Sequence, residues 1–358
     1  MIIGIDATKA ARAERTGVEE LTYQLILHLT AQDNANKYLL YTDRSLPGEI
    51  LRGQNLTQIL APLPRFWRRF RFPLALLRQR PDVLLIPGYT PPPLAPERTV
   101  VIVHDLAFKY FPEAYSVMER QLQARALGHT VRTAKHIICI SRSTERDLHK
   151  FYDFPESRTS VVYPGWDKNR FYQNRKKSSA SDYILFVGRL EERKNVAAVV
   201  QAYRRYRQQS QRQIKLVLAG RPGYGFGRIE KEIVLLGPLR KDVILMNYVE
   251  GEKLPELYAG AKLFLFPSLY EGFGLPVLEA FASGTPVITS NTSSLPEVAG
   301  DAALLVDPRN IDAVVGAMTE IIEDEAMQKE LIGRGYKQCQ KFSWDKTAGE
   351  VLAVLRSV

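Results

Sequence analysis

A strand, a glycine-rich loop and a helix follow one another in LFLFPSLYEGFGLPVLE, residues Leu263–Glu279. The stretch begins with four consecutive apolar residues, which predict a buried strand that ends at Pro267. Gly272 and Gly274 then free the backbone to approach a ligand closely, and a helix is expected to begin near Leu275. This order of elements is typical of a doubly wound α/β domain, in which ligands meet the carboxyl ends of the strands and the starts of the helices.

The same alternation of short apolar strands with helical stretches extends over the whole chain and predicts an α/β fold with two doubly wound, Rossmann-like domains facing a central cleft. The strands are expected at residues 2–6, 38–42, 58–61, 82–87, 99–104, 136–141 and 160–163, and then at 183–187, 214–219, 243–247, 263–267, 286–289 and 303–306. The domains are expected at residues 1–172 and 183–342, with a polar linker at 173–182 and a final helix at 343–358 that packs back on the first domain.

Composition excludes several classes of protein. The chain has 358 residues, of which 45% are hydrophobic and 25% charged, as in ordinary globular proteins. The apolar runs are much shorter than the roughly 18 to 20 residues of a membrane-spanning helix. The first residues, MIIGID, reach an acid too soon for a signal peptide, so we expect a cytoplasmic protein. Two cysteines, Cys139 and Cys339, predict buried thiols and neither a disulfide framework nor a cysteine metal site.

The net charge of +10 includes one basic stretch between Arg65 and Arg80, which contains six arginines, no acid and four aromatic residues. Nothing in it resembles a nucleic-acid-binding motif, so no nucleic-acid partner is expected. Contact with an anionic membrane or a lipid-linked substrate suits it better, which would place the protein at the inner face of the membrane. The alternative is an ordinary surface helix whose arginines are solvated and whose aromatic residues belong to the core.

Several catalytic motifs are absent from the sequence. It contains no phosphate-binding P-loop, no dinucleotide-binding G-x-G-x-x-G after the first strand, no C-x-x-C and no H-E-x-x-H. It also lacks an Asp-x-Asp pair that would chelate a divalent ion, and no metal ligands are predicted. The sequence therefore contains none of the motifs that would indicate a kinase, an ATPase or a dehydrogenase.

Two segments of the second domain instead suit a diphosphate. Arg189 leaves the end of a strand and Lys194 is expected to open the next helix, so that two cationic groups converge on the cleft. The helix that begins near Leu275 points its positive end at the same place. Glu279 follows within this helix and suits ribose hydroxyls, whereas Glu271 stays in the loop and reaches further out.

These segments make the chain resemble the retaining nucleotide-sugar glycosyltransferases of family four, which have the GT-B fold and an E-x7-E signature. The spacing from Glu271 to Glu279 matches that signature. The other matching segments are Thr16–Val18, Val103–Leu106, Val162–Asp167, Gly188–Arg189 with Lys194–Asn195, Gly284–Val287 and Leu295–Val298. The sequence is most similar to bacterial mannosyltransferases of polysaccharide assembly. It departs from the family at Thr16–Gly17, where a second glycine is common, and at Pro164–Gly165, where an asparagine often intervenes.

The resemblance implies a role for each candidate residue. In the C-terminal, nucleotide-sugar-binding domain, Arg189 and Lys194 would hold the donor diphosphate together with backbone N–H groups of Phe273, Gly274 and Leu275. Glu279 would hold the ribose, and Glu271 would touch the transferred sugar.

Two further candidates lie in the N-terminal, acceptor-side domain. The resemblance implies that Gly17 would approach the diphosphate from the start of the first helix, where only a glycine allows such closeness. His104 ends the strand expected at 99–104 and is expected to contact the sugar.

The resemblance further implies a retaining hexosyltransferase that needs neither a cofactor nor a metal. GDP-mannose is the first choice of donor and a UDP-sugar the second, and the acceptor is a glycan or a lipid-linked glycan. Retention would follow a same-face route or a covalent adduct on Glu271. The alternatives are an epimerase or phosphorylase of the same fold, which the intact E-x7-E segment disfavours, and a non-catalytic nucleotide-sugar-binding protein.

Overall fold

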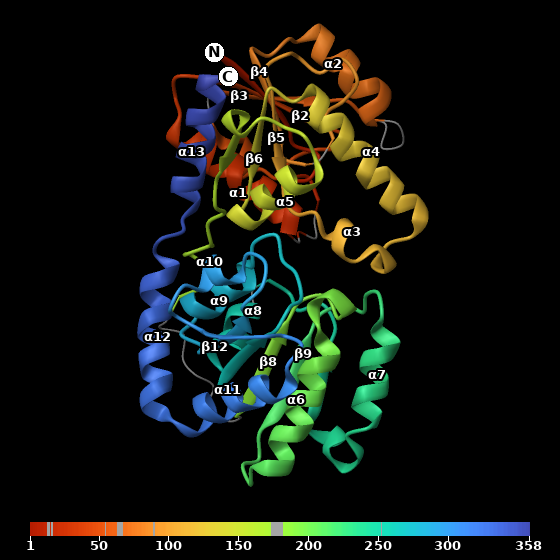
Figure 1. Cartoon of the computed structure of the whole chain (residues 1–358). Helices are drawn as coiled ribbons and strands as arrows, with labels where there is room; N and C mark the ends of the chain where they lie inside the picture. The colour runs from red at the N-terminus through yellow and green to blue at the C-terminus, as the bar shows by residue number, and fades with distance from the viewer. Residues whose placement is uncertain are drawn as a thin grey trace. The chain divides into compact units, whose positions relative to one another are not determined.

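The computed structural model describes residues 1–12, 15, 17–53, 55–62, 67–88, 90–172, 182–251 and 253–358. The chain forms two compact units (Figure 1). Unit 1 comprises Met1–Phe108, Tyr115–Gly165 and Ser343–Val358, and unit 2 comprises Lys109–Ala114 and Trp166–Phe342. Residues 173–181 of the expected linker lie outside the described residues.

Unit 1 is built on a parallel sheet with the strand order β3-β2-β1-β4-β5-β6-β7. The strands are β1 (Ile2–Asp6), β2 (Lys37–Thr42), β3 (Leu56–Leu60), β4 (Val83–Ile86), β5 (Thr99–Val103), β6 (His136–Cys139) and β7 (Thr159–Val161). The strand order reverses direction at β1, as in a doubly wound domain. The loops that follow β1, β4 and β5 therefore start next to one another at the carboxyl edge of the sheet.

The helical segments that follow these strands complete unit 1. They are α1 (Gly17–Gln32), the short η1 (Ile50–Arg52), the π-helix η2 (Trp67–Arg71), α2 (Phe72–Arg78), α3 (Ala107–Tyr110), α4 (Val117–Thr133), α5 (Arg142–Phe151), the short η4 (Glu156–Arg158) and α13 (Trp344–Ser357). The last residues of α3 belong to unit 2. The C-terminal helix α13 packs on α1, where Nδ1 of His28 lies 2.8 Å from Oδ1 of Asp345.

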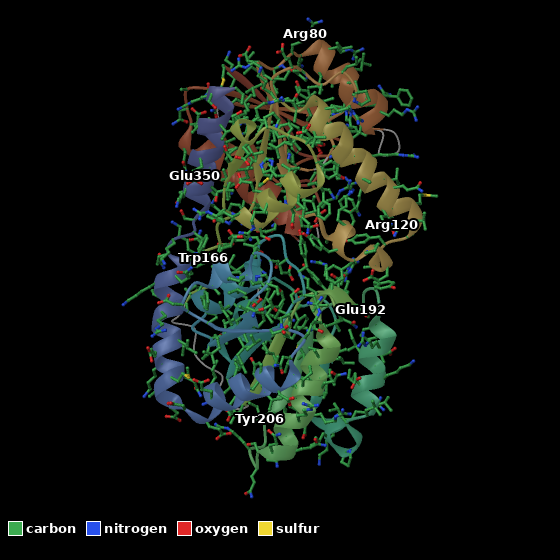
Figure 2. All side chains as sticks on the ribbon, viewed as in Figure 1. Arg80, Arg120, Trp166, Glu192, Tyr206 and Glu350 are labelled. Carbon is green, nitrogen blue, oxygen red and sulfur yellow. The ribbon has the colours of Figure 1, made fainter. Side chains whose placement is uncertain are left out.

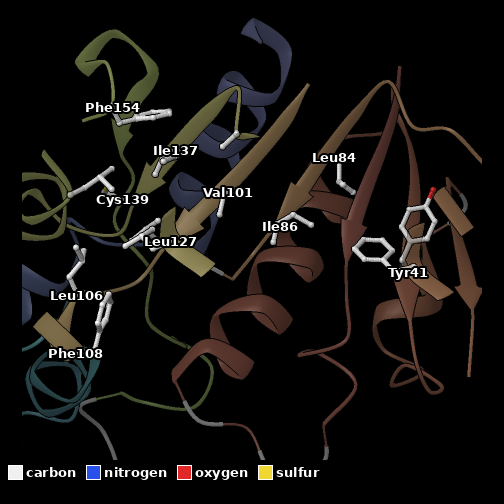
Figure 3. Packing of buried hydrophobic residues seen from close by; sticks show 14 of the residues in the cluster. Tyr41, Leu84, Ile86, Val101, Leu106, Phe108, Leu127, Ile137, Cys139 and Phe154 are labelled. Atoms are coloured by element: carbon white, nitrogen blue, oxygen red, sulfur yellow. The ribbon is translucent and has the colours of Figure 1, made fainter. Parts of the chain in front are cut away.

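The hydrophobic core of unit 1 joins the central strands to helices (Figure 3). The central strands β4 and β5 are buried along their whole length, because helices cover a parallel sheet from both sides. Trp67 and Phe72, from the basic stretch, belong to this core, and their rings stack with centroids 4.4 Å apart. Part of the stretch therefore forms core, as the surface-helix alternative predicted.

Unit 2 repeats the architecture with the strand order β10-β9-β8-β11-β12-β13, again all parallel. Its strands are β8 (Tyr183–Val187), β9 (Lys215–Ala219), β10 (Val243–Met246), β11 (Leu263–Phe266), β12 (Val287–Ser290) and β13 (Leu304–Val306). Its helical segments are η3 (Pro112–Ala114), η5 (Glu192–Lys194), α6 (Val196–Gln209), α7 (Phe226–Val234), η6 (Gly237–Asp242), α8 (Leu254–Ala259), α9 (Leu275–Ala282), α10 (Leu295–Ala299), α11 (Ile311–Glu323) and α12 (Glu325–Cys339). The expected fold class, an α/β protein with two doubly wound domains, is confirmed.

The boundaries of the units differ from the expected ones in two places. Unit 2 begins at Trp166 and not after residue 172, because the indole Nε1 of Trp166 donates a hydrogen bond of 2.7 Å to the carbonyl of Cys339. Unit 2 also includes Lys109–Ala114, where the ring of Tyr110 lies 5.1 Å from that of Tyr270. Such aromatic contacts between distant segments leave no mark in the local sequence pattern.

Candidate active site

The loop after β8 is held in place by its own backbone and by Asn195. Residues Glu192–Lys194 form a short 3-10 helix, and Asn195 adopts a left-handed conformation with φ of 59°. The Asn195 side chain donates to the carbonyl oxygens of Pro267 (3.1 Å) and Pro308 (2.7 Å). The expectation that Lys194 opens the next helix is therefore wrong. Lys194 ends the separate turn η5, and the left-handed Asn195 interrupts the helix between this turn and α6.

Lys194 is buried against Glu271. Its side chain is 13% exposed, and its Nζ lies 2.5 Å from Oε1 of Glu271. The neighbouring Arg193 lies with Nη1 3.6 Å from Oε2 of the same carboxylate and with Nη2 2.8 Å from Glu191. Arg193 Nη1 also donates to the carbonyl of Tyr270 at 2.9 Å. Arg193 and Lys194 thus bind the loop after β8 to the loop that carries Glu271, the first acid of the E-x7-E segment.

This cluster determines the charge of Glu271. Burial alone would raise the pKa of a carboxyl group, but the adjacent Lys194 and Arg193 hold the pKa of Glu271 below its ordinary value. Burial lowers the pKa of Lys194, against the opposing effect of Glu271. At neutral pH the site therefore contains a carboxylate whose charge is balanced by the cations beside it.

Arg189 differs from Lys194 in its surroundings. The side chain is exposed, and within the described part of the chain its guanidinium makes neither a hydrogen bond nor an ion pair. Its aliphatic part runs over Gly223, where an added Cβ would lie 2.9 Å from Cγ of Arg189. Its charge is therefore available to an anion, whereas Lys194 is already paired with Glu271.

The loop that leads into α9 presents the start of that helix. Gly274 has φ of 120°, and a Cβ there would lie 2.8 Å from Cδ2 of Leu295, so the position favours glycine. Leu275 is the first residue of α9, as expected. The ring of Phe273 packs on Phe342 in the core, with centroids 5.6 Å apart, so the Phe273 side chain is not a ligand-facing group. Phe273 can therefore contact a nucleotide sugar only through its backbone N–H group.

Glu279, on α9, has a partner that the sequence did not suggest. The hydroxyl of Tyr258, a fully buried residue of α8, donates a hydrogen bond of 2.9 Å to Oε2 of Glu279. Burial and the nearby carboxylate raise the pKa of Tyr258 well above its ordinary value, so the hydroxyl remains a donor. Tyr258 thereby orients the carboxylate expected to hold a ribose.

Unit 1 contains the remaining two candidates. Gly17 is the first residue of α1, with φ of 33° and no atom within 4 Å of an added Cβ, while its neighbour Thr16 lies outside the described residues. His104 is buried just after β5, and its Nε2 donates to the carbonyl of Pro87 at 2.8 Å. Burial lowers the pKa of His104, so the ring is neutral at pH 7, with Nδ1 as its acceptor nitrogen.

The described residues contain neither a candidate metal cluster nor a candidate membrane span. No three or more His, Cys, Asp and Glu side chains there are grouped so that they could hold a metal ion. None of the helices there is both long and apolar enough to cross a bilayer.

Two family models match the chain, one on each half. The model described as Glycosyltransferase Family 4 matches residues 15–170, and the model described as Glycosyl transferases group 1 matches residues 167–338. The first covers Gly17 and His104, and the second covers the Arg189, Lys194 and Glu271 cluster together with Glu279.

Curated relatives include mannosyltransferases. O-antigen chain mannosyltransferase B of Escherichia coli is 29% identical over 265 residues, which are 72% of this chain and 69% of the relative. The serotype-specific mannosyltransferase WbdA of Escherichia coli is 31% identical over 266 residues, which are 71% of this chain but only 32% of WbdA. The chain thus matches about a third of the WbdA length.

Solved structures with the same fold cover nearly the whole chain. Sucrose-phosphate synthase of Thermosynechococcus elongatus has a TM-score of 0.79 at 20% identity. The match includes 99% of this chain and 98% of the synthase chain. HepE of Anabaena, in complex with UDP and glucose, has a TM-score of 0.75 at 18% identity, with 100% of this chain and 99% of that chain covered.

Proposed function

Because the chain belongs to the family-four glycosyltransferases with the GT-B fold, we propose that it moves a hexosyl unit from a nucleotide diphosphate sugar to a glycan or lipid-linked acceptor. Mannose from GDP-mannose is the first choice, since curated relatives of about 30% identity are mannosyltransferases. The observation that supports the proposal most is the buried Lys194–Glu271 pair in the loop region that leads to the start of α9.

The reaction needs a group that accepts the negative charge of the leaving diphosphate. When the bond between the anomeric carbon and the diphosphate oxygen breaks, its electron pair stays on that oxygen. Arg189 is exposed and unpaired within the described residues, and Lys194 has three N–H donors, of which Glu271 occupies one. These cations, with the N–H groups at the start of α9, would stabilise the developing charge without a metal ion.

Glu271 and Glu279 then have separate roles. The carboxylate of Glu271 is kept anionic by its neighbours and would face the sugar, whose anomeric carbon becomes positive as the leaving group departs. Glu279, oriented by Tyr258, would accept hydrogen bonds from the ribose. In the same-face route, the acceptor hydroxyl attacks the anomeric carbon and its proton passes to the leaving phosphate oxygen, so configuration is retained.

The donor is identified by incubating the full chain with GDP-mannose, UDP-glucose or ADP-glucose and methyl α-mannobioside as a probe acceptor. We expect release of GDP and a trisaccharide whose new linkage has the donor's anomeric configuration by NMR. Release of UDP instead would move the donor choice to a UDP-sugar. Binding of a nucleotide sugar, seen as a raised melting temperature, with no release of nucleoside diphosphate would contradict a transferase and favour a binding protein.

A peripheral contact with an anionic membrane is the second part of the proposal. Phe70, Leu74 and Leu77 recur at helical spacing on η2 and α2 and are exposed, Phe70 by 59%. Exposed arginines flank these apolar residues, namely Arg69, Arg71, Arg78 and Arg80. Figure 2 labels Arg80 of this set. Basic and apolar side chains on one exposed helical segment are the chemistry that binds an anionic lipid surface. Arg65 and Phe66, also in the stretch, lie outside the described residues.

A further inference from the structure

Arg68 is directed differently from the exposed arginines that follow it. Its Nη2 lies 2.6 Å from Oδ2 of Asp6, and its Nη1 donates to the carbonyl of Thr90 at 2.9 Å. Asp6 is 2% exposed, whereas the Arg68 side chain is 37% exposed. The guanidinium is therefore fixed by a buried acid and a backbone carbonyl while part of it remains open to solvent.

These contacts place Arg68 at the carboxyl edge of the unit 1 sheet. Asp6 ends β1, and Thr90 follows β4, the strand that lies between β1 and β5. The segment after β4 is also held by His104, whose Nε2 donates to Pro87. Arg68 and His104 thus fasten the same short segment, one at Thr90 and the other at Pro87. Ligands of doubly wound domains bind at this edge.

The charges around Arg68 are balanced. Oδ1 of Asp6 accepts from both the N–H and the hydroxyl of Thr8, and Oδ2 holds Arg68. The described cations of the loop after β1 are also paired: Lys9 with Glu19 at 2.8 Å, Arg12 with Asp43 at 3.3 Å and Arg15 with Glu20 at 3.1 Å. These acids would repel a phosphate group as strongly as the bases beside them would attract it. A hydroxyl group needs only a fixed N–H donor.

We propose that Arg68 is a specificity-determining residue that donates hydrogen bonds to a hydroxyl oxygen of a neutral acceptor sugar. A guanidinium has five N–H donors, and two of those of Arg68 are used by Asp6 and Thr90. The pairing with Asp6 fixes the orientation of the remaining donors before the sugar arrives, which reduces the entropy lost on binding. The assignment of this sugar as the acceptor rests on the transferase function proposed above.

The test measures binding of methyl α-mannobioside to the full chain by NMR titration, without any donor. Variants Arg68→Gln and Arg68→Lys are compared with Arg52→Gln. Arg52 is an exposed arginine that precedes β3, and therefore lies toward the opposite, amino edge of the sheet. Arg68→Lys keeps the positive charge beside Asp6, so this variant folds even if Arg68→Gln leaves a buried carboxylate unpaired.

We expect Arg68→Gln to weaken binding at least tenfold, Arg68→Lys to weaken it by a smaller factor, and Arg52→Gln to leave it unchanged. Equal affinity of the wild type and both Arg68 variants would overturn the inference. So would a wild type that does not bind the mannobioside, or whose bound mannobioside is displaced by millimolar inorganic phosphate. Because the titration requires no turnover, a chain that binds the sugar through Arg68 but releases no nucleoside diphosphate would refute the transferase proposal alone.

Discussion

Glu271 is a buried acid whose charge depends on two neighbours, and this dependence has a consequence for pH. Its folded pKa is depressed, so the stability it contributes is present above the ordinary carboxyl pKa and is lost as the pH falls through the lower folded value. In Lys194→Met, burial would act on Glu271 with Arg193 as its remaining cation, at 3.6 Å. We expect its pKa to rise, so that the free energy of unfolding falls less steeply between pH 7 and pH 4 than in the wild type, because a folded state that takes up the proton earlier loses less stability in acid.

Urea unfolding at several pH values measures this dependence. A double variant, Lys194→Met with Glu271→Gln, removes the titrating group and is expected to give a slope that lies between those of the wild type and the single variant. An unchanged slope in the single variant would show that Lys194 does not control the charge of Glu271.

The hydrogen bond from Tyr258 to Glu279 leads to a second prediction about single residues. Tyr258→Phe removes the hydroxyl that donates to Glu279 and leaves the ring in the core. Loss of such a bond to a charged group costs about 1.5–3 kcal/mol, so we expect the KM for the donor to rise about tenfold or more with a smaller change in kcat. Tyr203→Phe, which removes a buried tyrosine hydroxyl bonded to the carbonyl of Ile214, is the matched control and should leave this KM unchanged.

At the scale of elements, the helix-and-strand pattern of the sequence was enough to place the sheets. The strand expected at 99–104 is β5 at Thr99–Val103, and the helix expected near Leu275 begins there. Periodicity did not give the direction of the arginines in the basic stretch, because η2 is a π-helix. Its i→i+5 repeat buries both Trp67 and Phe72.

The same limit applies to side-chain pairs. Lys194 and Glu271 are 77 residues apart in sequence, and only the order of the strands β8 and β11 brings their loops together. Arg193 and Tyr258 were missed for this reason. The one available signal was the position of Arg193 directly before Lys194 in a segment already expected to bind an anion.

The exposed face of η2 and α2 carries the membrane prediction. A variant with Arg69, Arg71 and Arg78 changed to Glu should lose binding to anionic vesicles, since each basic residue near such a surface contributes about 1 kcal/mol. Arg68 is left intact because it pairs with Asp6. Sedimentation with vesicles of phosphatidylglycerol and phosphatidylcholine measures the binding, and high salt should also abolish it.

A matched control changes Arg120, Arg125 and Arg132 of α4 to Glu, which alters the net charge equally. If this control loses binding to the same degree, only overall charge matters. Equal sedimentation with anionic and neutral vesicles would refute the membrane contact.

At the scale of the whole molecule, the chain passes between the units next to Gly165 and again at Ser343. A Cβ at Gly165 would lie 2.0 Å from the backbone nitrogen of Trp344 and 2.4 Å from the carbonyl carbon of Ser343. Backbone atoms cannot move aside as a flexible side chain can. We therefore expect Gly165→Ala to destabilise unit 1 by about 1–3 kcal/mol, the usual cost of overpacking, or more.

Chemical denaturation followed by circular dichroism measures this loss. Gly48→Ala, in unit 1, has no atom within 4 Å of its added Cβ and is the control. If the two variants unfold at the same urea concentration, the close approach of Gly165 to Trp344 is not a feature of the protein in solution.

Turnover of Arg189→Ala and Lys194→Ala in the presence of EDTA tests most directly whether cationic side chains stabilise the leaving diphosphate. We predict that the wild type keeps its activity in EDTA and that each variant loses about 100-fold or more in kcat, as is common when one preorganised charge-stabilising group is removed. Lys231→Ala, an exposed lysine of α7, should be unaffected. Near-normal kcat in either site variant, or loss of wild-type activity in EDTA with rescue by Mg²⁺ or Mn²⁺, would contradict the account.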